Sequence, residues 1–237
     1  MYHPLSASKV PDSDLVERTP LFQGLTASEL DACRQHLRCR TFPANATVMT
    51  AEQPGEVVFV ILSGCVKITT SLADGSEVML AILSADETVG EMSLTDNLGR
   101  SANVVTMEES TLAWMDRATF VEFLQSQPGL ARNLARILSG RLRSANAQIQ
   151  ALATQDVHGR IARQLLSLAE QYGKPQANGE VLIPLRLTQG DLASLVGASR
   201  VRVNQALVLY KERGYISVDQ SHRITVRDQD ALIRRCA

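Results

Sequence analysis

The hydrophobic pattern changes its period at about residue 117, and this change constrains the fold more than any other feature of the sequence. Before it, short β-rich runs bounded by Gly, Pro, Asn and Asp cover residues 57–62, 66–71, 78–83, 104–106 and 111–115. After it, apolar residues recur at helical spacing. Short strands at turn-marked intervals predict a small antiparallel barrel or sandwich, so the expected class is α+β.

Helices are predicted on both sides of the strands. Thr26 can cap a helix N-terminus and Glu29 can bond back to the cap, which predicts a helix of about ten residues. The helical spacing then predicts helices over 118–126, 130–155 and 160–172, with Pro128 stopping the first of them. Asp156 and Gly159 are interpreted as a hinge, followed by a polar loop at 173–179 and a strand at 181–185.

Charge is segregated along the chain, although its 237 residues sum to a net charge of −1. Residues 1–130 carry 8 Lys and Arg against 17 Asp and Glu, whereas residues 131–237 carry 16 against 8. A basic C-terminal part beside an acidic body indicates that the second part meets a polyanion such as nucleic acid. The sequence has neither an apolar run of ~18 residues nor a secretory signal, so a cytoplasmic, bacterial-type protein without membrane contact is expected.

Catalysis and metal binding find little support in the residue pattern. The cysteines Cys33, Cys39, Cys65 and Cys236 form no C-x-x-C pair and are expected to be free or buried thiols. The four histidines lie in four separate regions without metal-ligand spacing. The prediction is therefore a protein that is not an enzyme, with no metal, no iron–sulfur cluster and no identifiable haem ligands.

Residues 187–207 have the pattern of a helix-turn-helix. Thr188 and Asp191 mark a helix start, Gly197 permits a tight turn, and Ser199 caps a second helix. Val203, Ala206 and Leu207 are predicted to face inward. The opposite face presents side chains suited to a DNA major groove, namely Arg200, Val201, Arg202, Asn204 and Gln205. An ordinary helical hairpin is the alternative.

A hairpin is predicted after the second helix. Residues 215–218 and 223–226 read as two strands around the turn 219–222, which would form the wing of a winged helix-turn-helix. His222 and Arg223 at its tip are expected to contact phosphate rather than bases.

The long predicted helix carries a narrow apolar stripe. Its members recur at spacings of 4, 3, 4 and 3 and are Leu138, Leu142, Ala145, Ile149 and Leu152. An average of 3.5 is typical of a coiled-coil seam, so dimerisation is predicted, with a core-packed helix as the alternative.

A second constellation lies within the strand-rich part. A glycine before a helical turn offers free backbone N–H groups, and an arginine next to a serine can grip a phosphate. The residues are Gly90, Glu91, Met92 and Ser93, followed by Arg100, Ser101 and Ala102. A buried Glu91–Arg100 pair that serves only stability is the competing interpretation.

The order of these motifs, with residues 55–56, 61–64 and 156–162 in their places between them, closely resembles the cyclic-AMP receptor protein / FNR family of bacterial transcription regulators over about residues 20–227. The resemblance implies a flexible leader at 1–19, a cyclic-nucleotide-binding β-roll at 20–129, a dimerisation helix at 130–155 and a winged helix-turn-helix at 156–237. It also implies a homodimer that binds near-palindromic double-stranded DNA, works with RNA polymerase, and is reoriented by its ligand.

The resemblance also assigns ligand-binding roles. Glu91 matches a glutamate that holds the ribose 2′-hydroxyl, Arg100 and Ser101 match a pair that holds the cyclic phosphate, and Arg141 matches an arginine near the pocket. The Thr-Ser pair that reads adenine in cyclic-AMP-responsive members is replaced by Ala145 and Asn146. Asn146 offers a donor and an acceptor, so a purine is still expected but adenine is no longer specified. Cyclic AMP is the expected ligand, with cyclic GMP or no ligand left open.

On the DNA side, Arg200 matches an arginine that reads guanine, while the next two family readers are replaced by Val201 and Gln205. The half-site is expected to keep one guanine and to depart from the family consensus. Thr188, Gln189, Ser199 and Arg202 complete the predicted DNA surface. Two alternatives stay open: a regulator that binds DNA without a nucleotide or senses another molecule, and a nucleotide-sensing subunit that acts on a protein partner.

Overall fold

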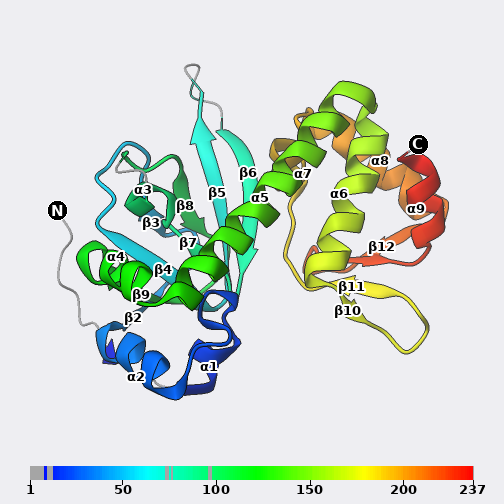
Figure 1. The fold of residues 1–237 in the computed structure, drawn as a ribbon. Coiled ribbons are helices and arrows are strands. Elements are labelled where there is room, and N and C mark those ends of the chain that lie inside the picture. The colour runs from blue at the N-terminus through cyan, green and yellow to red at the C-terminus, as the bar shows by residue number, and fades with distance from the viewer. Residues whose placement is uncertain (1–7, 10–12, 73–74, 76, 96–97, 237) are drawn as a thin grey trace. The chain divides into compact units, whose positions relative to one another are not determined.

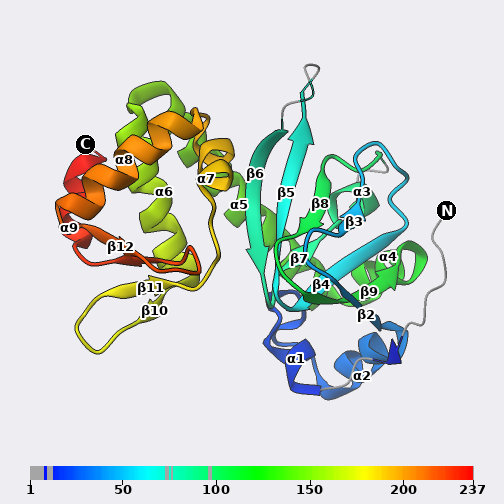
Figure 2. The same cartoon turned by 180° about the vertical axis from the view of Figure 1, so that it is seen from behind.

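The computed structural model describes residues 8–9, 13–72, 75, 77–95 and 98–236. It contains two compact units, of which one includes Leu80–Leu142 and the other includes Arg143–Ala237 (Figures 1 and 2). The boundary between the units lies within helix α5 (Pro128–Thr154) and not at either of its ends.

Short elements precede the barrel. The described part of the predicted leader contains β1 (Ser8–Lys9), which pairs with β2, and α1 (Ser13–Arg18), whose Val16 is buried in the core. The 3₁₀ helix η1 (Pro20–Phe22) and α2 (Ala27–His36) follow. The predicted capping box is confirmed, because Thr26 N donates to Glu29 Oε2 at 2.7 Å and Glu29 N donates to Thr26 Oγ1 at 3.3 Å.

The strands of the first unit form two antiparallel sheets. The five-stranded sheet has the order β1-β2-β9-β4-β7, with β2 (Arg38–Phe42), β9 (Ser110–Asp116), β4 (Val57–Ser63) and β7 (Thr88–Val89). The four-stranded sheet has the order β3-β8-β5-β6, with β3 (Thr47–Met49), β8 (Asn103–Thr106), β5 (Cys65–Ser71) and β6 (Glu77–Ser84). All five predicted strands are confirmed, whereas β1, β2, β3 and β7 had not been predicted as strands.

Strand β4 explains how the two layers are held together. Alternate residues face opposite sides of a strand. Val57, Phe59 and Ile61 contribute to the core between the sheets, in which Val104 of β8 also lies. Val58, Val60 and Leu62 contribute to a second core, where the five-stranded sheet packs against the helices. A strand buried on both faces accounts for its continuous apolar run in the sequence.

Two helices follow the strands. Asp116 caps α4 (Arg117–Ser126) by accepting from Thr119 N at 3.0 Å, and Pro128 begins α5 instead of merely stopping α4. Proline suits the first turn of a helix because its missing N–H would have no partner there. Buried Asn133 of α5 donates to the carbonyls of Leu21 and Gln23 at 3.0 and 2.7 Å, which fixes this helix to the N-terminal segment.

The second unit combines helices with a small sheet of order β10-β11-β13-β12. Its elements are α6 (Val157–Tyr172), β10 (Lys174–Pro175), β11 (Val181–Ile183), α7 (Gln189–Val196), α8 (Arg200–Glu212), β12 (Ile216–Val218), β13 (Ile224–Val226) and α9 (Gln229–Arg235). A hairpin replaces the polar loop predicted at 173–179, and α9 had no sequence prediction. Helix α6 begins earlier than predicted, because Asp156 caps it and Gly159 lies buried inside it.

Candidate functional site

Glu91 lies between β7 and α3 (Met92–Thr95), and its side chain is almost completely buried at 1% exposure. Arg141 of α5 donates from Nη1 to Glu91 Oε1 at 2.5 Å and from Nη2 to the carbonyl of Thr88. A buried carboxylate needs such a charged partner. The pair joins the β-roll to the first half of the long helix, within one unit.

Arg100 is also buried, at 7% exposure, and its guanidinium bonds to protein acceptors. Nη1 donates to the carbonyl of Gly90 at 2.7 Å and to Ser93 Oγ at 2.9 Å, while Nη2 donates to the carbonyl of Val57 at 2.6 Å. Gly90 has φ of 90°, and a Cβ there would lie 2.7 Å from Arg100 Nη1. Glycine is therefore required both for the backbone conformation and for the approach of the arginine.

The structure thus brings Gly90, Glu91, Ser93, Arg100 and Arg141 into one region of the first unit. The other predicted members differ in exposure: Met92 and Ser101 are exposed, and Ala102 is buried. Ala145 and Asn146 are exposed on the part of α5 that belongs to the second unit. The backbone acceptors of Val57 and Thr88 escaped the sequence analysis, because a carbonyl leaves no mark in a residue pattern.

The second unit contains the predicted helix-turn-helix. Asp191 N donates to Thr188 Oγ1 at 3.1 Å and Thr188 N donates to Asp191 Oδ2 at 3.0 Å, which forms a capping box at the start of α7. Gly197 ends α7 in the left-handed conformation with φ of 61°, and Ser199 caps α8. The inward residues are confirmed, since Val203, Ala206 and Leu207 are all buried.

The outward face of α8 is open. Arg200, Val201, Arg202, Asn204 and Gln205 are exposed, and Val201 reaches 67% exposure. Gln189, the first residue of α7, donates from Nε2 to Asn204 Oδ1 at 2.9 Å. Both residues were predicted to lie on this surface, but no local pattern predicts the bond between them, which joins positions 15 residues apart.

The predicted wing is confirmed as an antiparallel pair of β12 and β13. At its tip, Asp219 accepts from the backbone N–H groups of Ser221 and Arg223 at 2.8 and 2.9 Å and from Arg223 Nε at 2.7 Å. The Arg223 backbone N–H is the main reason that the pKa of Asp219 is lowered. His222 is exposed with φ of 60°, next to an arginine whose charge is partly balanced by Asp219.

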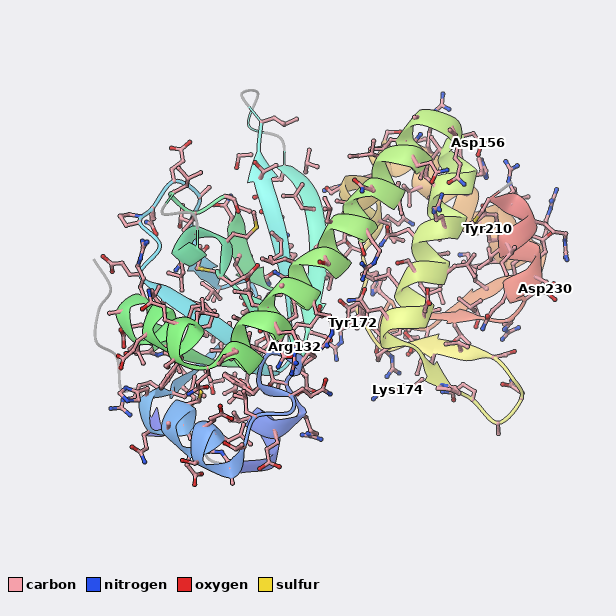
Figure 3. All side chains as sticks on the ribbon, in the orientation of Figure 1. Arg132, Asp156, Tyr172, Lys174, Tyr210 and Asp230 are labelled. Atoms are coloured by element: carbon pink, nitrogen blue, oxygen red, sulfur yellow. The ribbon has the colours of Figure 1, made fainter. Side chains whose placement is uncertain are left out.

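Arg160 connects three segments of the second unit: the end of α5, the start of α6 and the turn of the helix-turn-helix. This region is the joint between α5 and α6. Arg160 Nη1 donates to the carbonyl of Gln155 at 3.1 Å, and its Nε and Nη2 donate to the carbonyls of Val196 and Gly197 at 2.8 and 3.2 Å. Figure 3 marks Asp156 at this joint. The predicted hinge is thus a bonded joint in this structure, and the role of Arg160 was missed because its partners are backbone carbonyls.

Tyr210 of α8, also labelled in Figure 3, supports the same joint. Its hydroxyl donates to the carbonyl of His158 at 2.8 Å, and burial raises the pKa of Tyr210 to about 12. The phenol therefore stays neutral and keeps donating at physiological pH.

Several other features bear on alternative functions. Cys33, Cys39, Cys65 and Cys236 form no disulfide, and burial raises the pKa of Cys33 to about 11, so this thiol is unreactive at neutral pH. Within the described ranges, no group of three or more His, Cys, Asp and Glu side chains is arranged to hold a metal ion. In the same described ranges, no helix is both long enough and apolar enough to cross a membrane.

Comparison with known proteins identifies both units. Residues 39–127 match the model of the cyclic nucleotide-binding domain, and residues 159–235 match the Crp-like helix-turn-helix domain. A CRP-like cAMP-activated global transcriptional regulator from Mycobacterium tuberculosis is 35% identical, over 94% of this chain and 98% of the relative.

Solved structures of other proteins share this fold. FixK2 from Bradyrhizobium japonicum shares the fold with a TM-score of 0.76 at 18% identity, over 85% of this chain and 98% of that one. The c-di-GMP-responsive regulator CLP from Xanthomonas campestris has a TM-score of 0.71 at 25% identity, over 86% and 100% of the two chains. The chain therefore belongs to the cyclic-AMP receptor protein / FNR family, whose members are DNA-binding transcription regulators and not enzymes.

Proposed function

We propose that this transcription regulator is a homodimer whose affinity for DNA is controlled by a purine cyclic nucleotide, with cyclic AMP as the first candidate. The observation that carries the proposal is the buried Glu91–Arg141 pair. Glu91 belongs to the nucleotide-binding domain and Arg141 to helix α5, which continues without interruption to Thr154. A ribose hydroxyl that donates to Glu91 would compete with Arg141 and so would act directly on α5.

The phosphate is assigned to Arg100 and Ser101. Exposed Ser101 follows buried Arg100 directly. An anion can therefore approach the Ser101 hydroxyl from solvent while the buried guanidinium contributes its positive charge. The bonds from Arg100 to Gly90 and Val57 hold that charge in place before the ligand arrives. A preorganised charge loses less conformational entropy on binding than a mobile one.

The base is assigned to Ala145 and Asn146 on α5. Both are exposed, and the amide of Asn146 can pair with either donors or acceptors of a purine. A relative activated by cAMP and a structural neighbour that responds to c-di-GMP support a nucleotide ligand while differing in its identity. The ligand assay must therefore include cyclic AMP, cyclic GMP and c-di-GMP.

Dimerisation is assigned to the apolar seam of α5. Leu142, Ala145, Ile149 and Leu152 are exposed, with Leu142 and Ile149 at 63% and 64%. An exposed apolar stripe on a long helix is typical of an interface. Leu138, the fifth predicted member, packs instead against the core of its own unit and is only partly exposed. The seam we propose therefore begins at Leu142.

The DNA surface is assigned to α8, the start of α7 and the wing. Arg200 would read a guanine, Val201 a thymine methyl and Gln205 an adenine, while Thr188, Gln189, Ser199, Arg202, His222 and Arg223 would contact the backbone. Two copies of α8 in a dimer would meet successive major grooves of a near-palindromic site. The protein would act in the cytoplasm, with RNA polymerase as its partner at promoters.

Nucleotide control is tested by measuring DNA affinity at fixed salt, first without ligand and then with each nucleotide, on duplexes selected from a random pool. One nucleotide is expected to tighten specific binding, and Ser101→Ala is expected to weaken this effect because it removes a phosphate contact from an exposed position. Glu180→Gln, an exchange directly before β11 in the second unit, serves as the control. Equal affinity in every condition would contradict nucleotide control and leave DNA binding intact.

The dimer is tested by light scattering after size-exclusion chromatography. Ile149→Glu is expected to produce monomers, because a carboxylate in an apolar seam would lose its hydration. Ile233→Glu is the matched control, since Ile233 of α9 is exposed to a similar degree, 55%, but lies outside the seam. A dimer that tolerates Ile149→Glu would contradict the assignment.

Nucleotide-independent DNA binding remains the second candidate, and one observation favours it. The Arg100 guanidinium already donates to three protein acceptors, as a purely structural arginine would. Calorimetric titration with the three nucleotides separates the two candidates, because a structural β-roll would bind none of them.

A further inference from the structure

The two helices of the helix-turn-helix are linked on their outward side by two exposed side chains. Gln189 Nε2 donates to Asn204 Oδ1 at 2.9 Å. Asn204 follows Arg200 by four residues on α8, so both side chains lie on one face of this helix. The bond therefore orients a side chain on the same surface that is assigned to DNA.

We propose that Gln189 is a positioning residue that sets which base Asn204 prefers; the inference rests on the role of α8 in reading DNA stated under the proposed function. A free asparagine reads adenine with both ends of its amide, accepting from N6 and donating to N7. In this structure Oδ1 is turned toward Gln189. Because the amide is planar, Nδ2 is turned away from Gln189 and remains as the donor for a base.

An amide that presents only its donor favours a different base. The major-groove edge of guanine has two acceptors, N7 and O6, and no donor, whereas the edges of adenine and cytosine each carry an amino group. An amino group facing Nδ2 would place two donors together. Asn204 is therefore expected to prefer guanine over adenine and cytosine, which reverses the usual preference of an asparagine.

The guanidinium of the neighbouring reader, Arg200, also lies close to the same helix. A Cβ at Gly190 would lie 3.2 Å from both Nε and Nη2 of Arg200, so the guanidinium rests against the first turn of α7. The first two residues of α7 thus lie beside the side chains of Asn204 and Arg200, which present two donors, Nδ2 and the guanidinium. Two donors one helical turn apart predict two guanine contacts in each half-site, not one.

The decisive variant is Gln189→Glu in the full-length protein. A carboxylate cannot donate to Oδ1 but can accept from Nδ2, so the amide of Asn204 should turn over and present its oxygen to the base. The readout is the relative affinity for duplexes that differ at single half-site positions. At one position the preference is expected to move from guanine to adenine or cytosine, by about threefold to tenfold in relative affinity.

Other effects of Gln189→Glu are recognised by how they depend on the DNA sequence. The added negative charge lowers affinity equally for every duplex, because the phosphate backbone is the same in all of them. Gln176→Glu introduces the same charge in the loop between β10 and β11 and is expected to leave every base preference unchanged. Gln189→Glu on an Asn204→Ala background is expected to shift no preference, which shows that the effect acts through Asn204.

Failure of this inference is distinguishable from failure of the proposed function. If the wild-type protein discriminates among duplexes, and Gln189→Glu leaves all of its preferences unchanged, Gln189 does not position Asn204 and DNA reading by α8 stands. If the wild-type protein discriminates among no duplexes, the reading role of α8 is wrong and the inference falls with it.

Discussion

The assigned nucleotide site and the assigned DNA surface differ in what stabilises their charged side chains. In the first unit, Glu91 and Arg100 are buried and are bonded to Arg141, to backbone carbonyls and to Ser93. In the second unit, Arg200 and Arg202 are exposed on α8. A buried charge must be paired to be tolerated, whereas an exposed charge is solvated by water until a partner arrives. The charges of the first site are therefore part of the core of their unit, whereas those of the second lie on the surface of theirs.

The largest effect should come from removing Arg100. Arg100→Met leaves the carbonyl of Val57 without this donor and the carbonyl of Gly90 with only the 3.3 Å bond from Ser93 Oγ, so the free energy of unfolding should fall by at least the cost of one orphaned acceptor, about 1–3 kcal/mol. Urea unfolding followed by fluorescence of the single tryptophan, Trp114 on β9, measures the loss in this unit. Unchanged stability would show that the buried site is not part of the core and would break the comparison.

An intermediate effect is expected on DNA, without any effect on stability. Arg200→Ala should remove about 1–3 kcal/mol of discrimination at one guanine, because a bidentate contact is lost. Competition titrations with duplexes substituted at that base pair measure it. Arg202→Ala is the matched control: affinity should fall uniformly across sequences and the salt slope should decrease by about 1. The thermal melt followed by circular dichroism, which reports the helices of both units, should not move in either variant, and a shift in it would contradict the comparison.

The smallest effect concerns the joint between α5 and α6. Asp156 accepts from Gly159 N at 2.7 Å, which is the main cause of its lowered pKa, and its Oδ2 accepts from Arg235 at 2.9 Å. Since the folded pKa lies below the unfolded value of about 4, this contribution to stability is present above pH 4 and is lost as the pH falls through the folded pKa.

Asp156→Ala should therefore destabilise the joint by about 1 kcal/mol at pH 7 through loss of the helix cap. Thermal melts followed by circular dichroism at pH 7 and pH 3 measure the difference from the wild type. Asp156→Asn keeps a capping oxygen and removes the charge, so most of the stability at pH 7 should remain and the pH-dependent part should disappear. An unchanged pH dependence in Asp156→Asn would assign it to other carboxylates.

Local patterns predicted most elements of this protein. The Thr26 capping box, the helix start at Thr188, the turn at Gly197 and the inward face of α8 are confirmed, because each depends on residues close together in the chain. The strands β1, β2, β3 and β7 were not predicted: β1 and β7 have only two residues each, and β2 and β3 contain charged or polar residues in place of a continuous apolar run. Helix α9 was missed because its seven residues make only about two helical turns.

At the functional sites, too, the sequence determined some features and the tertiary structure determined others. The sequence by itself determined which residue types are present at Gly90, Glu91, Arg100 and on α8, and these alone led to the family. Only the tertiary structure decided that Arg141 pairs with Glu91, that Arg160 bonds to Val196 and Gly197, and that Gln189 orients Asn204. These contacts join distant segments and often end on backbone carbonyls. Such acceptors exist at every residue, so no sequence pattern marks them.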